Sequence, residues 1–289
     1  MKKNLLLIFY CLLFNVTNGQ ITLTETDIKQ TGVIFKIAYD TLNLGTATHG
    51  NSGVSQTWDF STLVPSFNDE VRILNRKTAP YNNKFPDANA VMAWNENNTP
   101  LYAFVKVDSN YFINQGIGFP EDWNYGPFDL VPQDTIFSFP VNYLDTWSGK
   151  YAYETYQNGD TLKTKYTTVK YDTVDAWGNI ITPDTTLSAL RVKSVEYKYD
   201  TVFYNIGGGN WAPIQTSLLK ETKYDWWVKD LGYPILELTL DSIGSLSEIK
   251  YVTNKFSNVP MPYFGYDVNN MDVQFHDSTV NTANVYLWY

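Results

Sequence analysis

Short runs of aromatic and β-branched residues, interrupted by polar turn residues, make up most of the chain, and this pattern favours strands over helices. Gly and Pro recur so often that no window of helical length keeps a 3.6-residue apolar period. Period-2 stretches are frequent instead. Leu236, Leu238 and Leu240 fall on one face of an expected strand, and polar residues between them fall on the other. The sequence therefore predicts an all-β protein.

The stretch 143–253 predicts an antiparallel meander of long strands. Residues 161–174 and 190–204 are rich in Thr and Tyr and carry charges at alternate positions, as expected of strands with one face in water. Three turns are predicted within the meander: Trp177-Gly178-Asn179, Pro183-Asp184 and Gly207-Gly208-Gly209-Asn210. Residues 20–142 have shorter strands and more proline loops. One domain over 20–258, an antiparallel sandwich of two packed sheets, accounts best for both parts.

Residues 1–19 predict a signal peptide. A positive start precedes the apolar run 5–14, which is too short to span a bilayer as a helix, and small residues follow at the cleavage positions. A buried N-terminal helix is the plain alternative. A lipoprotein is disfavoured because the residue before Cys11 is not the Gly or Ala that a lipobox needs. We expect cleavage after Gly19, a mature chain that begins at Gln20, and a secreted or outer-surface location.

Composition excludes several classes of protein. A hydrophobic content of 44% is enough for a core, so a disordered chain is excluded. The 30 Asp and Glu outnumber the 21 Lys and Arg, which argues against binding of nucleic acid. Cys11 is the only cysteine, so the mature chain has no disulfide and depends on a sizeable core. No other segment reaches 18 apolar residues, so we expect no transmembrane segment in the mature chain. We also expect the chain to be a monomeric module.

A resemblance to a known group of proteins rests on residues 50–61, which read G-N-S-G-V-S-Q-T-W-D-F-S. This run is similar to the G-x-x-Q-T-W-D-F-S segment of secreted Bacteroidota proteins that commonly carry a type IX secretion sorting domain. Further stretches fit the same β-rich N-terminal module: 174–183 with 189–193, and 224–227 with 233–236. The resemblance spans about 20–255 and implies no particular activity. The sequence departs from the pattern because it carries no sorting domain.

A second resemblance concerns 272–279 and 285–289, which are similar to the opening hairpin of a PKD domain, an Ig-like sandwich. The matching residues are Val273, Phe275, Asp277, Ser278, Tyr286 and Trp288. The resemblance implies that 259–289 hold a linker and an incomplete PKD-like hairpin. The alternation of apolar residues also allows an ordinary final hairpin.

Groups for catalysis or metal binding are few. His49 lies near Ser52 but no G-x-S-x-G turn surrounds that serine, and His276 is far away in the chain. With two histidines and no mature cysteine the chain has too few ligands for zinc, and no D-x-D-x-D-G calcium loop is present. We expect no metal, no cofactor and no enzymatic activity.

Paired carboxylates are the remaining catalytic possibility. The richest cluster is Glu121, Asp122, Asp129 and Asp134, interspersed with Trp123, Tyr125 and Phe128. An active-site or sugar-binding loop has this composition, and so has a solvated loop, which we favour. Trp226 and Trp227 are adjacent on an expected strand, so their rings should point to opposite faces. We take Trp123, Trp226 and Trp227 as candidates for stacking on a sugar, with core packing as the alternative.

Asp followed by Thr or Ser and then an aliphatic residue or Thr recurs along the chain, and this tripeptide resembles the O-glycosylation sequon of extracytoplasmic Bacteroidota proteins. The candidate sites are Thr41, Thr135, Thr161, Thr173, Thr185, Thr201, Ser242 and Ser278. The alternative is that Asp ends a turn and Thr begins a strand on propensity alone.

Three functions remain open. The favoured one is a non-catalytic secreted or cell-surface module of a larger adhesin-like protein, with an extracellular glycan or protein as partner. The second is a carbohydrate-binding accessory domain. The third is a carboxylate-dependent glycoside hydrolase.

Overall fold

The computed structural model describes residues 20–96, 99–119, 126–157, 160–256, 264–269 and 272–277. Nearly all of its regular structure is strand, which confirms the predicted all-β class. The helices are the short α1 (Glu25–Ile28) and the 3-10 turn η1 (Arg76–Thr78). The strands of the first half are β1 (Val33–Tyr39), β2 (Gly53–Asp59), β3 (Phe67–Asn75), β4 (Ala90–Glu96), β5 (Thr99–Val107), β6 (Tyr111–Gly118) and β7 (Phe128–Ser138). Those of the second half are β8 (Thr146–Gln157), β9 (Leu162–Ile181), β10 (Thr186–Gly207), β11 (Asn210–Trp227), β12 (Leu236–Leu240), β13 (Leu246–Phe256), β14 (Phe264–Asn269) and β15 (Asp272–Asp277).

Thirteen of the described strands are hydrogen-bonded into one sheet. Its path is β2-β9-β10-β11-β12-β13-β1-β3-β4-β5-β6-β7, and β8 also pairs with β9. The strands β8 and β2 lie end to end along one edge of β9, because β8 pairs with 162–173 and β2 with 176–181. The β2–β9 pair is parallel, and the other pairs of this sheet are antiparallel.

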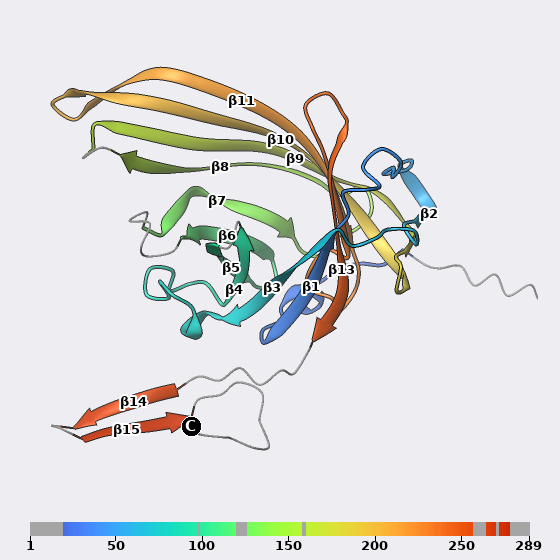
Figure 1. The fold of residues 1–289 in the computed structure, drawn as a ribbon, viewed down its shortest axis with the longest axis horizontal. Coiled ribbons are helices and arrows are strands. Elements are labelled where there is room, and N and C mark those ends of the chain that lie inside the picture. Colours follow the sequence, from blue (N-terminus) through green and yellow to red (C-terminus); the bar gives the residue numbers. More distant parts are fainter. Residues whose placement is uncertain are drawn as a thin grey trace, which may run out of the picture.

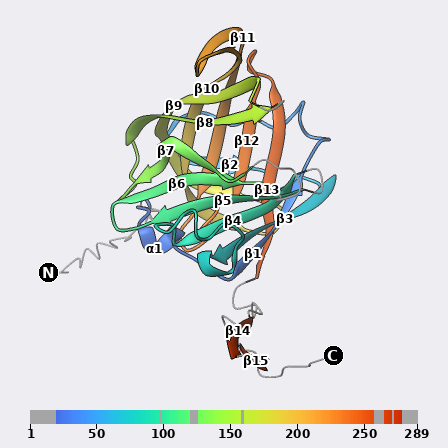
Figure 2. The same ribbon diagram turned by 90° about the vertical axis from the view of Figure 1, so that its left-hand side faces the viewer.

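The predicted meander over 143–253 is confirmed, because β8 to β13 are each bonded to the next strand in sequence. A second meander runs from β3 to β7. The predicted sandwich of two packed sheets is not confirmed, because β1 is bonded to β13 on one edge and to β3 on the other, which joins the strands into one continuous sheet. The single sheet curls until β4–β7 face β8–β11 (Figures 1 and 2). Bulges such as the one between Lys36 and Ile37 add the local twist that such curling requires.

The predicted turn at Trp177-Gly178-Asn179 is wrong, because these residues lie inside β9. Gly178 pairs with Gln56 of β2, and a Cβ at Gly178 would lie 1.9 Å from the Gln56 carbonyl oxygen. Glycine is therefore needed here for the close approach of a parallel neighbour. The other two predicted turns are confirmed, since Pro183-Asp184 joins β9 to β10 and Gly208-Gly209 joins β10 to β11.

The main core lies between the facing parts of the curled sheet. Phe35 of β1, Phe137 of β7 and Trp227 of β11 are buried in it. The Phe137 and Trp227 rings meet at 4.7 Å, which joins β7 to β11 across the interior. A smaller cluster, centred on Phe104, packs the 79–88 segment against β4 and β5.

Beyond β13 the chain forms a separate two-stranded sheet, in which β14 pairs with β15. The predicted PKD-like hairpin would pair 272–279 with 285–289, whereas 272–277 pair here with 264–269. Residues 285–289 and the predicted signal peptide, 1–19, lie outside the described residues. Across the described parts of the chain, no helix has the length and apolar character needed to cross a membrane.

Candidate functional site

A band of charged side chains crosses the inner face of the long meander. Lys170 and Asp172 of β9 and Glu196 of β10 belong to it, and each of these residues is at most 8% exposed. Strand pairing continues the band, because Asp225 of β11 pairs with Glu237 of β12, and Glu237 pairs with a lysine of β13. The interior charged band consists of Asp134, Lys170, Asp172, Glu196, Lys223, Asp225, Glu237 and Lys250.

One end of the band joins β7 to β9. Lys170 Nζ lies 2.6 Å from Asp134 Oδ1 of β7 and 3.9 Å from Asp172 Oδ2. Ser194 Oγ donates a hydrogen bond to Asp172 Oδ1. Among the described strands no backbone ladder connects β7 to β8 or β9, so this ion pair links two strands that only side chains join.

The other end of the band runs from β10 to β13. Glu196 Oε2 lies 3.2 Å from Lys223 Nζ, and Glu237 Oε2 lies 2.6 Å from Lys250 Nζ. Asp225 lies between these pairs, and its buried Oδ1 has no hydrogen-bond partner among the described residues. Most charges in the band thus face an opposite charge on a neighbouring strand, which limits the cost of burying them.

Burial and charge shift the pKa values of the carboxyl groups in different directions. Burial raises the pKa of Asp172 to about 6, although Lys170 opposes the shift. Burial, and next the charge of Glu237, raises the pKa of Asp225 to about 8. Burial acts on Glu196 too, but Lys223 and then a second lysine outweigh it and lower the pKa of Glu196. The surroundings therefore favour the protonated form of Asp225 and the ionised form of Glu196.

A cavity of about 320 Å³ lies beside the band, on the inner face of the shorter strands. Its apolar and aromatic walls are Ile37, Tyr39, Val71, Met92, Trp94, Ala103, Val105 and Ile136. Its other polar groups are Asp69, Asn114, Tyr233 and, from the band, Lys250. Small-molecule pockets have this composition, a mainly apolar wall with a few polar groups that orient the ligand.

The prediction that the alternate charges of the long strands face water is wrong for the part next to the core. Lys170, Asp172 and Glu196 point inward, whereas Tyr171 on the outer face of β9 is 54% exposed. The reason is that opposite charges meet on some neighbouring strands, as Lys170 does with Glu196 and Glu237 does with Lys250. That complementarity between strands is the sequence signal that could have found the band.

The carboxylates of the predicted cluster, Glu121, Asp122, Asp129 and Asp134, do not lie together in one described site. Asp134 belongs to the interior charged band, and burial raises its pKa. Asp129 is half exposed and pairs with Lys84 at 3.0 Å. Three predicted site residues lie outside the described residues: Glu121, Asp122 and Trp123.

Trp226 and Trp227 point to opposite sides of β11, as predicted, but both are buried, at 0% and 6% exposure. The Trp226 ring meets the Trp58 ring edge-on at 5.7 Å, and the Trp227 ring meets Phe137. Neither ring offers a free face at the surface. The structure therefore places both in the core rather than on a sugar-stacking platform.

The candidate glycosylation sites that are described all keep accessible surface. Four are exposed: Thr41, Thr161, Thr185 and Ser242. Three are partly exposed: Thr135, Thr173 and Thr201. Ser278 lies outside the described residues. Two of the triplets coincide with turns, since Asp40 and Asp241 accept hydrogen bonds from backbone N–H groups two or more residues onward.

Within the described ranges, no group of three or more His, Cys, Asp or Glu side chains is arranged to hold a metal ion. His49, predicted to be a solvated loop residue, is instead partly buried and stacks on Tyr224 at 4.2 Å. Burial lowers the pKa of His49. Its Nδ1 bonds the carbonyl oxygen of Gly50, and Ser52 is exposed.

No family model and no curated protein matches the chain. Among solved structures, a Bacteroides fragilis protein described as exported and as having a YmcC-like fold aligns with 81% of this chain and 100% of its own, at 9% identity. The TM-score is 0.30, too low for the likeness to support an argument about fold, location or function.

Proposed function

We propose that the chain is a non-catalytic, extracytoplasmic binding module that takes a small, mainly apolar ligand into the 320 Å³ cavity. The observation that carries this proposal is the cavity wall itself. Met92, Trp94 and Val105 form an apolar surface inside the sheet, and Lys250 at its edge is already paired with Glu237. A neutral ligand with one polar end suits this wall best, since an unpaired charge would be costly there.

The absence of catalysis is part of the proposal. A general acid or base must reach the reacting atom as well as have a pKa near the working pH. Asp172 and Asp225 have raised pKa values, but neither belongs to the cavity wall as the described residues form it. The carboxyl group in that wall is Asp69.

The neutral fluorophore N-phenyl-1-naphthylamine tests the cavity, because Trp94 in the wall reports its arrival by energy transfer. We expect saturable binding to the chain from residue 20 onward. Ala103→Leu fills the cavity and should weaken binding at least about tenfold, since the added side chain occupies the ligand's volume. The matched control is Ala212→Leu, which makes the same change on β11, away from the cavity.

Equal affinity of Ala103→Leu and the wild type would contradict the proposal, as would an absence of saturable binding. Because Ala103→Leu adds volume to a core position, its unfolding midpoint is measured beside that of Ala212→Leu. Ile136→Trp fills the same space from β7 and serves as the second variant.

A glycoside hydrolase is the second candidate, and the raised pKa values of Asp172 and Asp225 are the observation that favours it. A glycosidase panel run on the wild type, Asp172→Asn and Asp225→Asn tests it. Turnover that either substitution abolishes would replace the non-catalytic proposal.

The wider architecture is also proposed on sequence grounds. The module belongs to a larger adhesin-like surface protein, is exported by type IX secretion, continues into a PKD-like domain and carries O-glycans at some of its exposed sites. The exposure of Thr41, Thr161, Thr185 and Ser242 supports modification there. Glycopeptide mass spectrometry of the exported protein tests the modification.

A further inference from the structure

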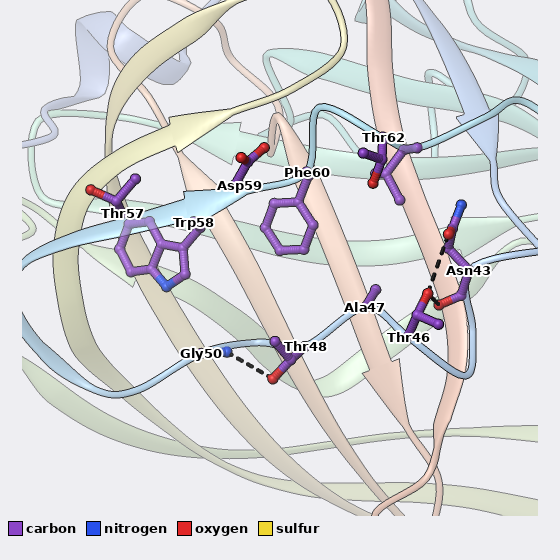
Figure 3. A pocket seen from close by; sticks show the side chains of 11 residues that line it. Asn43, Thr46, Ala47, Thr48, Gly50, Thr57, Trp58, Asp59, Phe60 and Thr62 are labelled. Atoms are coloured by element: carbon purple, nitrogen blue, oxygen red, sulfur yellow. Dashed lines mark hydrogen bonds between the residues drawn. The ribbon is translucent and has the colours of Figure 1, made fainter.

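A second pocket, of about 230 Å³, lies between the loop 43–50 and the segment 57–63 (Figure 3). It shares none of its described lining residues with the interior cavity. Trp58 of β2 and Phe60 just after it point toward the loop that carries Ala47 and Thr48, whereas Asp59 points away (Figure 3). Successive side chains of a strand point to opposite faces, and Phe60 continues this alternation just beyond the end of β2.

A single buried carboxylate fixes both sides of this pocket. Asp40, 1% exposed, accepts hydrogen bonds from the backbone N–H groups of Asn43 at 2.9 Å and of Val64 at 2.7 Å. It also accepts one from Asn43 Nδ2 at 2.6 Å. Asn43 begins the loop, and Val64 follows the opposite wall. The separation of the two walls is therefore set before any ligand arrives.

Arg191 fixes the far end of the pocket. This residue is 1% exposed, and its Nε and Nη2 donate to the two carboxylate oxygens of Asp175 at 2.8 and 2.9 Å. Its Nη1 donates to the carbonyl oxygen of His49, the residue next to Gly50 in the loop. Its guanidinium carbon lies 5.5 Å from the centre of the Trp58 ring. The loop and the indole are thus held by the same side chain.

The Trp58 indole presents a donor that the protein does not use. Trp58 is 3% exposed, and its Nε1 has no hydrogen-bond partner among the described residues. The indole edge faces Gly50, where an added Cβ would lie 3.3 Å from Nε1 and 3.1 Å from Cδ1. Thr48 Oγ1 accepts a hydrogen bond from the Gly50 N–H at 3.2 Å, so a hydroxyl group is held next to Gly50 in the loop. A buried N–H without a partner costs free energy, so a ligand oxygen placed here would be favoured.

The rest of the wall suits the carbon face of a sugar. Phe60 and Leu63 are buried apolar residues, and Ala47 adds a methyl group from the loop. The pocket carries no charged side chain that points into it, since Asp59 is turned away (Figure 3). A neutral molecule with hydroxyl acceptors and an apolar face matches both kinds of surface.

We propose that this pocket binds a single neutral sugar residue, with Trp58 Nε1–H donating to one of its oxygens and Phe60 contacting its carbon face. A Kd on the order of 1 mM is expected for so small a ligand. This site does not depend on the interior cavity, so either binding proposal can be contradicted without the other.

The test is a titration of the ¹⁵N-labelled chain with D-glucose, D-galactose, D-mannose and N-acetyl-D-glucosamine, followed by the indole N–H resonances of its 9 tryptophans. The Trp58 resonance is the one missing from Trp58→Phe, which keeps an aromatic ring but removes the donor. We expect this resonance to shift saturably with at least one sugar. Trp58→Phe should bind that sugar about tenfold more weakly. The matched control, Trp177→Phe, alters a tryptophan away from the pocket and should bind as the wild type does.

Ala47→Leu fills the pocket from the loop and serves if Trp58→Phe does not fold; it should abolish the shift of the Trp58 resonance. The proposal is overturned if no sugar shifts that resonance. It is equally overturned if Ala47→Leu binds as well as Trp177→Phe.

Discussion

The inner faces of the two meanders of the sheet differ in chemical character. The shorter strands, β1 and β3–β7, present mainly apolar side chains to the interior, such as Ile37, Val71 and Val105. The strands β9–β13 present the interior charged band over the same space, next to apolar residues such as Val174 and Val192. The shorter strands therefore gain stability mainly by apolar burial, with Asp134 of β7 as their contribution to the band, and the other strands need matched charges. The cavity lies where the two kinds of surface meet.

The largest effect is expected from breaking the charge pairing that joins β7 to β9. Lys170→Met leaves Asp134 and Asp172 buried without their cation, and should lower the free energy of unfolding by about 3 kcal/mol. Urea unfolding measures it. The matched control is Lys84→Met, which removes the same charge from the half-exposed pair with Asp129 and should cost less than about 1 kcal/mol. Equal losses in the two variants would mean that the band contributes no more than a surface pair.

The apolar half is tested by shortening a side chain at the cavity wall. Ile37 is 1% exposed, and Ile37→Ala should lower the free energy of unfolding by about 2 kcal/mol, because the cavity grows. Ile34→Ala changes the same strand at a partly exposed position and should cost less than half as much. The comparison fails if the outer-face variant is the more damaging of the two.

The charged band should also make the stability of the protein depend on pH. A carboxyl whose pKa is higher in the folded protein holds its proton more tightly when folded, so its contribution to stability falls as pH rises. For Asp225 that window runs from its ordinary value of 3.8 to about 8, and the groups that face it are Glu237, Lys223, Lys250 and Glu196.

Asp225→Asn should therefore be more stable than the wild type at pH 9 by about 1 kcal/mol or more, and should lose this advantage near pH 4. Thermal unfolding over that pH range measures it. An unchanged pH slope in Asp225→Asn would show that Asp225 titrates normally.

The smallest effect is expected at the far end of the long strands. Ile214 of β11 is 60% exposed, so Ile214→Ser should change the free energy of unfolding by less than about 0.5 kcal/mol. Chemical unfolding checks it. A loss as large as that of Ile37→Ala would mean that another surface covers β11.

Much of the strand order is visible in the sequence, and most of the site is not. The long meander follows from the Thr- and Tyr-rich runs and from turn residues such as Pro183 and Gly208. Gly178 reads as a turn because its partner, Gln56 of β2, lies far away in the chain. Alternating charges along a strand also do not show which of its faces is buried. Inward charges such as Lys170 and Glu196 neutralise each other only after the strands pair.

The most direct test of the account is thiol labelling of β9 and β10, because the chain from residue 20 onward contains no cysteine. Ser194→Cys places a thiol on the inner face beside Asp172, at a position that is 7% exposed, and Tyr171→Cys places one on the outer face. We expect the folded protein to protect Ser194→Cys from 5,5′-dithiobis(2-nitrobenzoate), while Tyr171→Cys reacts as fast as in urea. Rapid reaction of Ser194→Cys and protection of Tyr171→Cys would contradict the claim that the charged face points inward.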